Sequence, residues 1–306
     1  MRISAIVPAY NHAQYLNESI GSILAQTQPV DEIILVDDGS TDETRQVAAS
    51  FGRRVKYIYQ TNRGLSAARN TGVRAASCEW VALLDSDDWW KPHKIRLQRE
   101  AALRRPTAAL VYTATTTAFP DGSESVGKPV PPDALWPMLR VTNLIAPSSI
   151  MARRDALLDC GGFNEQLTAC EDWDMWVRLR QRHSFANVPE AVTVYRYGES
   201  SMSNNVGRML SNMERILEPT LLVNLDGPRR ILWRRRIRAV QLFHAALMAR
   251  SIGEAEERHY LTRSLAQWPS PCFWPTRYAA VARNTLGPRL YSDLRSRLQK
   301  LNFKKA

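Results

Sequence analysis

The chain has 306 residues, enough for one large domain or two modest ones with a substantial core. Its hydrophobic content of 44% and charged content of 23% are ordinary for a globular protein, and no stretch approaches eighteen uninterrupted apolar residues, which argues against a membrane-spanning helix. We expect no secretory signal at the N-terminus. Four cysteines without metal-ligand or CxxC spacing indicate reduced thiols in a cytosolic protein.

The net charge of +11 is distributed unevenly along the chain. Residues 1–206 hold 22 lysines and arginines against 23 acidic residues, whereas residues 207–306 hold 19 against 7. The basic excess therefore belongs to the last third of the chain. We predict a domain boundary here, with one domain over residues 1–205 and a basic helical region over residues 206–306.

Short apolar runs alternate with amphipathic segments in the first ninety residues. The predicted buried strands are Ile3–Val7, Ile33–Val36, Val55–Tyr59 and Val81–Leu84. A helix follows each of the first three strands. Asn11 is the expected cap of the first helix, and Ser40 with Glu43 forms the capping box of a second helix beginning at Thr41. This alternation predicts an α/β fold with a doubly wound, mainly parallel sheet.

Polar loops follow three of these strands. They are Pro8-Ala9-Tyr10-Asn11, Asp37-Asp38-Gly39 and Asp85-Ser86-Asp87-Asp88. In doubly wound sheets, ligands bind outside the carboxyl ends of the strands, so the three loops predict one site. The closely spaced carboxylates of the third loop repel one another unless a cation or water lies among them, and such oxygen ligands suit Mg²⁺ or Mn²⁺. The alternative is an acidic turn that caps the following helix.

The remaining elements are less regular. We predict a helix from Lys91 to Pro106, an extended segment at Ala108–Ala118, a surface loop over 119–137 with five prolines, a strand at Pro147–Ala152, a short helix at Arg154–Asp159, a helix beginning at Glu171 and a strand at Val192–Tyr197. After residue 207 the pattern is helical. One helix carries Trp233, Ile237, Val240, His244 and Leu247 at helical spacing, and a last helix begins at Pro288 with a leucine stripe flanked by arginines.

Six motifs occur in one order along residues 2–203. They are Val7-Pro8-Ala9-Tyr10-Asn11, Val36-Asp37-Asp38-Gly39-Ser40-Thr41-Asp42, Asn62-Arg63-Gly64-Leu65-Ser66-Ala67-Ala68-Arg69-Asn70, Leu84-Asp85-Ser86-Asp87-Asp88, Gly161-Gly162-Phe163 and Glu171-Asp172-Trp173. Each motif alone is weak, but the ordered set is specific. In this respect the chain resembles the family 2 glycosyltransferases of the GT-A fold.

The resemblance implies a nucleotide-diphosphate sugar as donor. Asp38 would accept the N3–H of a uracil or thymine base, while Pro8, Ala9 and Tyr10 would wall the nucleotide. Arg69 would lie near the diphosphate or hold the acidic loop, and Asp85 and Ser86 would also contact the donor.

The resemblance also implies a divalent metal, Mg²⁺ or Mn²⁺, bound by Asp85 and Asp87. Asp172 would be the general base, and Gly162, Glu171 and Trp173 would lie on the acceptor side. Relatives often carry a histidine after the strand at Val192–Tyr197. Here that segment has no histidine, so either Glu199 or a serine substitutes for it, or the metal is bound more weakly. His12, His93 and His183 are interpreted as structural or solvent-facing.

We therefore predict an inverting glycosyltransferase that moves a sugar from a UDP- or dTDP-type donor to a hydroxyl acceptor, a glycan or a lipid-linked acceptor, in surface polysaccharide or glycolipid assembly. The alternatives are a metal-dependent nucleotidyltransferase and a nucleotide-sugar-binding protein without turnover. The basic C-terminal region favours an anionic membrane surface over a merely solvated face, and nucleic acid is not expected. The predicted location is the cytoplasm or the inner face of the cell membrane.

Overall fold

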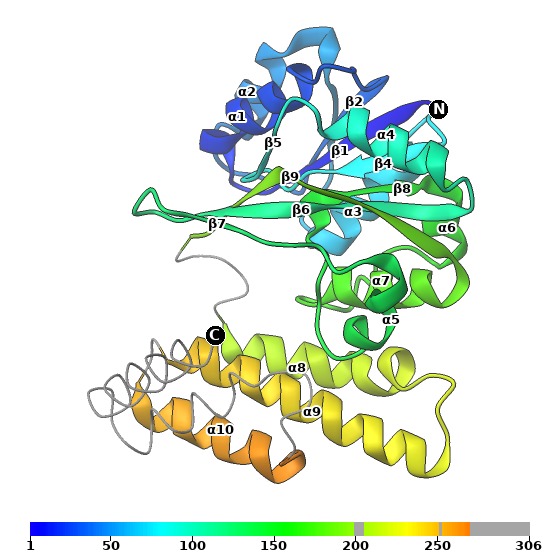
Figure 1. Cartoon of the computed structure of the whole chain (residues 1–306). Helices are drawn as coiled ribbons and strands as arrows, with labels where there is room; N and C mark the ends of the chain where they lie inside the picture. Colours follow the sequence, from blue (N-terminus) through cyan, green and yellow to red (C-terminus); the bar gives the residue numbers. More distant parts are fainter. Residues whose placement is uncertain (199–204, 251–252, 270–306) are drawn as a thin grey trace, which may run out of the picture. The chain divides into compact units, whose positions relative to one another are not determined.

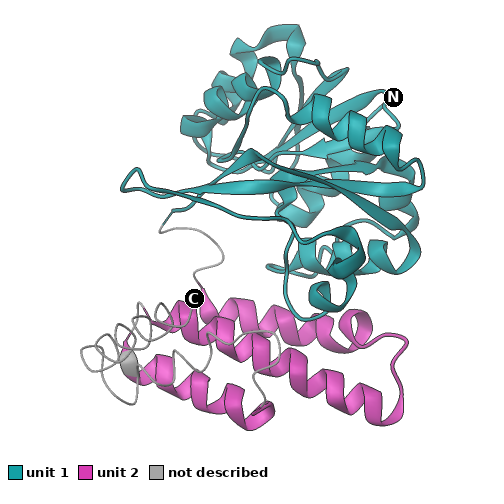
Figure 2. Cartoon of the chain, viewed as in Figure 1, with its two compact units in different colours: residues 1–202 teal, residues 203–306 magenta. Residues whose placement is uncertain are grey.

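The computed structural model describes residues 1–198, 205–250 and 253–269. The chain forms two compact units, Met1–Met202 and Ser203–Ala306, shown in teal and magenta in Figure 2. This division falls close to residue 205, where the charge of the chain changes.

A nine-stranded sheet runs through the first unit (Figure 1). Its strands are β1 (Ile3–Ala9), β2 (Glu32–Asp37), β3 (Lys56–Tyr59), β4 (Trp80–Leu83), β5 (Trp89–Trp90), β6 (Ala108–Ala118), β7 (Glu124–Val126), β8 (Ile150–Arg153) and β9 (Ser184–Arg196). Their order is β3-β2-β1-β4-β8-β6-β9-β5, with β7 paired to β6. The first four strands are mutually parallel, whereas β8 lies antiparallel to β4 and to β6. The predicted α/β class and the parallel first half are confirmed.

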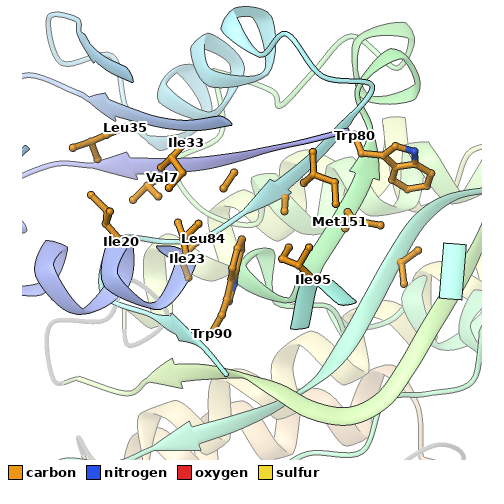
Figure 3. Close-up of a cluster of buried hydrophobic side chains, with 14 of the residues drawn as sticks. Val7, Ile20, Ile23, Ile33, Leu35, Trp80, Leu84, Trp90, Ile95 and Met151 are labelled. Carbon is orange, nitrogen blue, oxygen red and sulfur yellow. The ribbon is translucent and has the colours of Figure 1, made fainter. Parts of the chain in front are cut away.

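Helices cover both faces of this sheet. They are α1 (Ala13–Leu24), α2 (Thr44–Ser50), α3 (Leu65–Ala75), α4 (Lys94–Arg104), α5 (Pro132–Leu139), α6 (Arg154–Asp159) and α7 (Glu171–Arg182). Figure 3 shows Val7 of β1 and Leu35 of β2 in one core cluster with Ile20 of α1 and Ile95 of α4. Neighbouring residues of a strand point to opposite faces, so Ile6 lies on the other side, against α3.

The contact between α3 and β1 leaves no room for a side chain at Gly72. A Cβ there would lie 2.3 Å from Cγ2 of Ile6, whereas a Cβ at Gly21 of α1 would meet nothing within 4 Å. We expect Gly72→Ala to lower the free energy of unfolding by about 1–3 kcal/mol through overpacking. Gly21→Ala, the matched control, should raise it by about 0.5–1 kcal/mol because alanine favours the helix. Urea unfolding of both variants checks the pair, and equal effects would contradict it.

Two predicted helix caps are wrong. Asn11 has a φ of 54° and does not cap α1; its side-chain oxygen accepts a hydrogen bond from the backbone N–H of Thr41 at 2.8 Å. The Ser40 hydroxyl accepts one from the backbone N–H of Asn11 at 3.0 Å, and α2 begins only at Thr44, whose N–H is bound by Asp42. These polar residues tie the loop after β1 to the loop after β2 instead of starting helices.

The predicted surface loop over 119–137 is also partly wrong. β7 turns back to pair with the end of β6, and α5 follows it. Pro132 occupies a first-turn position of α5. The backbone N–H that proline lacks has no partner within the helix at this position, and the fixed φ of proline suits a helix. The proline content therefore predicted a loop where the chain forms a helix, α5, which packs against α7.

The second unit is helical in its described part, as predicted. It contains α8 (Val206–Ile216), a π-helical turn at Leu217–Leu221, α9 (Gly227–Ala249) and α10 (Glu254–Gln267). Ile237 and Val240 of the predicted apolar face of α9 are buried, but Leu247 is 45% exposed. The last predicted helix, from Pro288, lies outside the described residues. In the described ranges, no helix is long and apolar enough to cross a membrane.

Part of the basic charge of α9 is paired within this unit. Glu218 forms ion pairs with Arg230 and Arg234, and Glu214 pairs with Arg238. All five side chains are partly exposed, so each pair adds little to stability. The pairs nevertheless reduce the positive charge that α9 presents to solvent.

Candidate functional site

The loops after β1, β2 and β4 meet at one edge of the sheet. β1 lies between β2 and β4, and the chain reverses the direction in which strands are added at this point. The backbone N–H of Asp38 donates to the carbonyl of Ala9 at 2.9 Å, which joins the first two loops. The ring of His12 joins the first loop to the third through Ser86. The predicted convergence of these three loops is therefore present, at the switch point where such sheets bind ligands.

Asp38 is buried, 3% exposed, with its carboxylate held by three donors. Gln60 Nε2 donates to it at 2.7 Å, the backbone N–H of Arg63 at 2.9 Å and that of Gly64 at 2.8 Å. A carboxylate offers about four lone-pair positions, so one remains for a ligand. Beside it, Pro8 and Ala9 are buried and Tyr10 is 48% exposed, which leaves the tyrosine ring available to a bound base.

The acidic segment after β4 is a tight turn. The backbone N–H of Asp88 donates to the carbonyl of Asp85 at 3.0 Å, as in a β-turn. The Asp88 carboxylate is buried and accepts from the Ser148 hydroxyl at 2.5 Å and from the backbone N–H of Arg196 at 2.9 Å. Burial, together with the charges of Asp87 and Asp85, raises the pKa of Asp88 well above its usual range. Asp88 thus holds the turn, whereas Asp85 and Asp87 are partly exposed.

Asp85 and Asp87 have the chemistry of a hard-cation site. Burial and the charge of Asp85 raise the pKa of Asp87, so a nearby cation would relieve the repulsion between the two carboxylates. In the part of the chain that the structure describes, no cluster of three or more His, Cys, Asp or Glu residues could hold a metal by itself. Mg²⁺ is commonly bound by one or two carboxylates together with substrate phosphates, and the two aspartates fit that arrangement.

Arg69 connects the acidic turn to α7. Its guanidinium is 1% exposed and donates to Oδ1 of Asp85 and to Oε1 of Glu171, each at 2.7 Å. The ring of Phe163 lies 5.5 Å from its central carbon. The ion pair with Asp85 means that Arg69 holds the acidic loop, one of its two predicted roles, and a position near the diphosphate stays a prediction.

Asp172 lies in the first turn of α7. The helix begins after Cys170, whose φ of 62° turns the chain sharply. Oδ2 of Asp172 accepts a hydrogen bond from Asn143 at 2.7 Å. Burial, then the charge of Glu171, raises the pKa of Asp172 to about 7, against the opposing effect of Arg69. A carboxylate with a pKa near the working pH is suited to general-base catalysis.

The acceptor-side assignment needs correction. The Trp173 side chain is 2% exposed and its indole N–H donates to the carbonyl of Leu139 at 2.6 Å, so it lies in the core under α5 and has no free face for a sugar. Glu171 is buried in the ion pair with Arg69. Gly162 has a φ of 70° and a Cβ there would lie 2.6 Å from Oδ1 of Asn70. The structure therefore places these three residues in packing and ion-pair contacts, with Trp173 and Glu171 buried.

Two residues of the site were missed from sequence. His12 was interpreted as structural or solvent-facing, with no partner apparent from the sequence, and its Nδ1 lies 2.7 Å from the hydroxyl of Ser86. Arg196, at the end of β9, donates from Nε to the carbonyl of Asp87 at 2.9 Å. The available signal was the position of Arg196 at the end of β9 and of His12 in the loop that follows β1. The predicted substitution of Glu199 or a serine for a histidine lies outside the described residues.

The model of the family described as Glycosyl transferase family 2 matches residues 4–157, half of the 306-residue chain. The chain belongs to this family. The resemblance predicted from the six motifs is confirmed, and the first unit is a family 2 glycosyltransferase domain.

Curated relatives of this family domain match part of this chain. The chain is 48% identical over 100 residues to an uncharacterised glycosyltransferase of Nostoc sp., covering 31% of each protein. It is 29% identical over 222 residues to an uncharacterised glycosyltransferase of Rickettsia typhi, covering 69% of each. The chondroitin synthase of Pasteurella multocida is 32% identical over 193 residues, 61% of this chain and 20% of that protein. The chain thus spans well under half the length of several curated relatives.

Solved structures show the same fold. TarS of S. aureus, residues 1–349, in complex with UDP, matches 93% of this chain and 88% of its own with a TM-score of 0.60 and 18% identity. The same protein in complex with UDP-GlcNAc matches 94% of this chain and 92% of its own, with a TM-score of 0.60 and 16% identity. At this identity the likeness establishes the GT-A fold.

Proposed function

We propose that the protein is an inverting glycosyltransferase that moves a sugar from a UDP- or dTDP-type nucleotide-diphosphate sugar to a hydroxyl acceptor. The bridge made by Arg69 is the observation that carries the proposal. It links Asp85 of the acidic turn to Glu171, the neighbour of Asp172, so the donor loop and the base belong to one rigid assembly. TarS, which shares the fold, has been solved with UDP and with UDP-GlcNAc, in support of a uridine donor.

The donor side follows from the loops at the sheet edge. Asp38 uses its remaining lone pair for the N3–H of a pyrimidine, and Tyr10 covers the base. Asp85 and Asp87 hold Mg²⁺ or Mn²⁺ with the diphosphate. When bound, such a metal neutralises the charge that develops on the leaving phosphate.

The acceptor side depends on Asp172. Its carboxylate accepts the proton of the attacking hydroxyl, and Asn143 keeps Oδ2 oriented by a hydrogen bond of 2.7 Å. Attack from the face opposite the leaving group inverts the anomeric carbon. The family match disfavours a nucleotidyltransferase, and the presence of a carboxylate, Asp172, at the start of α7 disfavours a binding protein without turnover.

A panel of nucleotide sugars tests the proposed reaction. Purified protein is incubated with UDP-, dTDP- and GDP-sugars in Mg²⁺ or Mn²⁺, and slow hydrolysis or transfer to simple hydroxyl acceptors is measured by release of the nucleotide. We expect release from uridine or thymidine donors and none from guanosine donors. Equal release from all, or none from any, would contradict the proposal.

Asp87→Asn should abolish the metal-dependent part of nucleotide binding and leave the fold intact, because the neutral amide no longer attracts a cation. Calorimetry with UDP in Mn²⁺ and in EDTA measures that part directly. Asp121→Asn, at a hydrogen-bonded aspartate of the β6–β7 turn, is the control and should bind as the parent does. Unchanged affinity and metal dependence in Asp87→Asn would mean that the acidic turn is only structural.

The acceptor and cellular context remain predictions. The named relatives in Pasteurella multocida are a chondroitin synthase and a hyaluronan synthase, which supports a glycan acceptor and a role in surface polysaccharide assembly. The basic second unit supports an anionic membrane surface as partner. The ion pairs on α9 weaken that support, since three of its arginines are already paired.

A further inference from the structure

His12 joins the loop after β1 to the acidic turn after β4 through one hydrogen bond. Its Nδ1 lies 2.7 Å from the hydroxyl of Ser86, a side chain that is 3% exposed. Ser86 stands between Asp85 and Asp87, the two carboxylates that fit a metal. His12 itself follows the segment that walls the nucleotide. The contact therefore couples the loop that faces the base to the turn that faces the diphosphate.

Other parts of the acidic turn are held from different elements. Ser148 accepts from the backbone N–H of Asp85 and donates to Asp88, and Arg196 binds the carbonyl of Asp87. Among the described residues, the hydrogen-bond partner of the Ser86 hydroxyl is His12. Removing the imidazole leaves that central residue of the turn without its anchor while the flanking anchors remain.

The imidazole is itself fixed in place. His12 precedes α1, and its carbonyl accepts from the backbone N–H of Tyr15 at 3.0 Å. Its ring meets the Tyr15 ring edge-on, with centroids 5.6 Å apart. The preceding residue, Asn11, is tied to the loop after β2 by hydrogen bonds with Ser40 and Thr41. A rigid donor or acceptor loses little entropy when it orients a partner, so this contact suits a positioning role.

We propose that His12 is a positioning residue of the donor site, which acts through Nδ1 on Ser86 and so sets the orientation of Asp85 and Asp87 toward the diphosphate. The inference rests on the proposed function. It assigns no contact between His12 and the donor. The effect should appear in metal-dependent nucleotide binding and not in metal-free binding, where Asp38 holds the base.

Two conservative variants distinguish a role of Nδ1 from a role of Nε2. The side-chain amide of asparagine ends near the place of Nδ1, whereas that of glutamine reaches the place of Nε2. UDP affinity is measured by calorimetry with Mn²⁺ and with EDTA. We expect His12→Ala and His12→Gln to weaken binding in Mn²⁺ by about three- to tenfold, the worth of one hydrogen bond, and His12→Asn to stay within about twofold of the parent. Binding in EDTA should be unchanged in all three.

A double-mutant cycle tests the partner. Ser86→Ala should weaken binding in Mn²⁺ as His12→Ala does, and the double variant should lose no more than either single one. His93→Ala is the matched control, because His93 also precedes a helix and its Nδ1 also contacts a hydroxyl, that of Thr27 at 3.2 Å. It should bind UDP as the parent does.

Three outcomes overturn the inference. Unchanged affinity of His12→Ala in Mn²⁺ removes the positioning role. Rescue by glutamine and not asparagine means that His12 acts through Nε2 on the ligand. Additive losses in the double variant mean that His12 and Ser86 act independently. If the parent binds no UDP, the proposed function fails together with this inference, whereas normal parental binding with any of the three results leaves the proposed function standing.

Discussion

Asp172→Asn should lower sugar transfer by at least about a hundredfold and leave UDP binding nearly unchanged. General-base catalysis typically contributes about 10²–10⁴-fold, and an amide cannot take up the proton of the acceptor hydroxyl. The substitution preserves the size of the side chain, and Asn143 remains beside it. Transfer is measured by release of UDP in the presence of acceptor, with UDP affinity measured separately by calorimetry.

The same variant should change the pH dependence of transfer. The base acts only when deprotonated, and the pKa of Asp172 is raised to about 7. The rate of the parent should therefore fall about tenfold per pH unit below 7 and reach a plateau above it, while Asp172→Asn should lack this limb. Asp174→Asn, two residues further along α7 and ion-paired to Arg178 at 2.7 Å, is the matched control and should retain the limb. A flat profile for the parent between pH 5.5 and 8.5 would remove Asp172 as the base.

Local sequence carried enough information for the fold and for the donor loops. Strand β1 (Ile3–Ala9) is buried at every position and apolar except for Ser4, because both faces of the sheet are covered, and β2 ends at Asp37. Parallel strands bring their carboxyl ends to one edge, so Asp38 and Asp85 could be placed together without coordinates. The confirmed family membership adds the chemistry to this placement.

What could not be predicted depended on distant partners. Asn11 and Ser40 are both residue types that commonly cap helices. In the structure, however, each forms a hydrogen bond with the loop of the other, 29 or more residues away in the chain. His12 had no visible partner because Ser86 lies 74 residues further along the chain. Helical spacing showed that α7 is amphipathic but not that the face bearing Trp173 is the one under α5. In each case the sequence suggested a local role for a residue whose contact in the structure is with a distant part of the chain.

Arg69→Met should lower the free energy of unfolding by about 3–5 kcal/mol, because it leaves Glu171 buried without its partner. Glu171 is 5% exposed, so water cannot replace the guanidinium, whereas Asp85 is more exposed and can be solvated. For a unit of about 200 residues this corresponds to a fall in Tm of roughly 10 °C. Calorimetric scanning and urea unfolding measure it, and transfer should also fall because the acidic turn loses its link to α7.

The origin of this loss can be separated from the loss of packing. Adding Glu171→Gln to Arg69→Met removes the unpaired charge and should recover part of the stability, a non-additive result expected for residues in contact. Arg96→Met is the matched control, since its pair with Glu100 has the same 2.7 Å distance but side chains that are 37% and 41% exposed. That exposed pair should contribute less than about 0.5 kcal/mol. If Arg69→Met costs no more than Arg96→Met, the buried bridge does not hold the acidic turn to the base, and the assembly on which the proposed function rests must be held by other contacts.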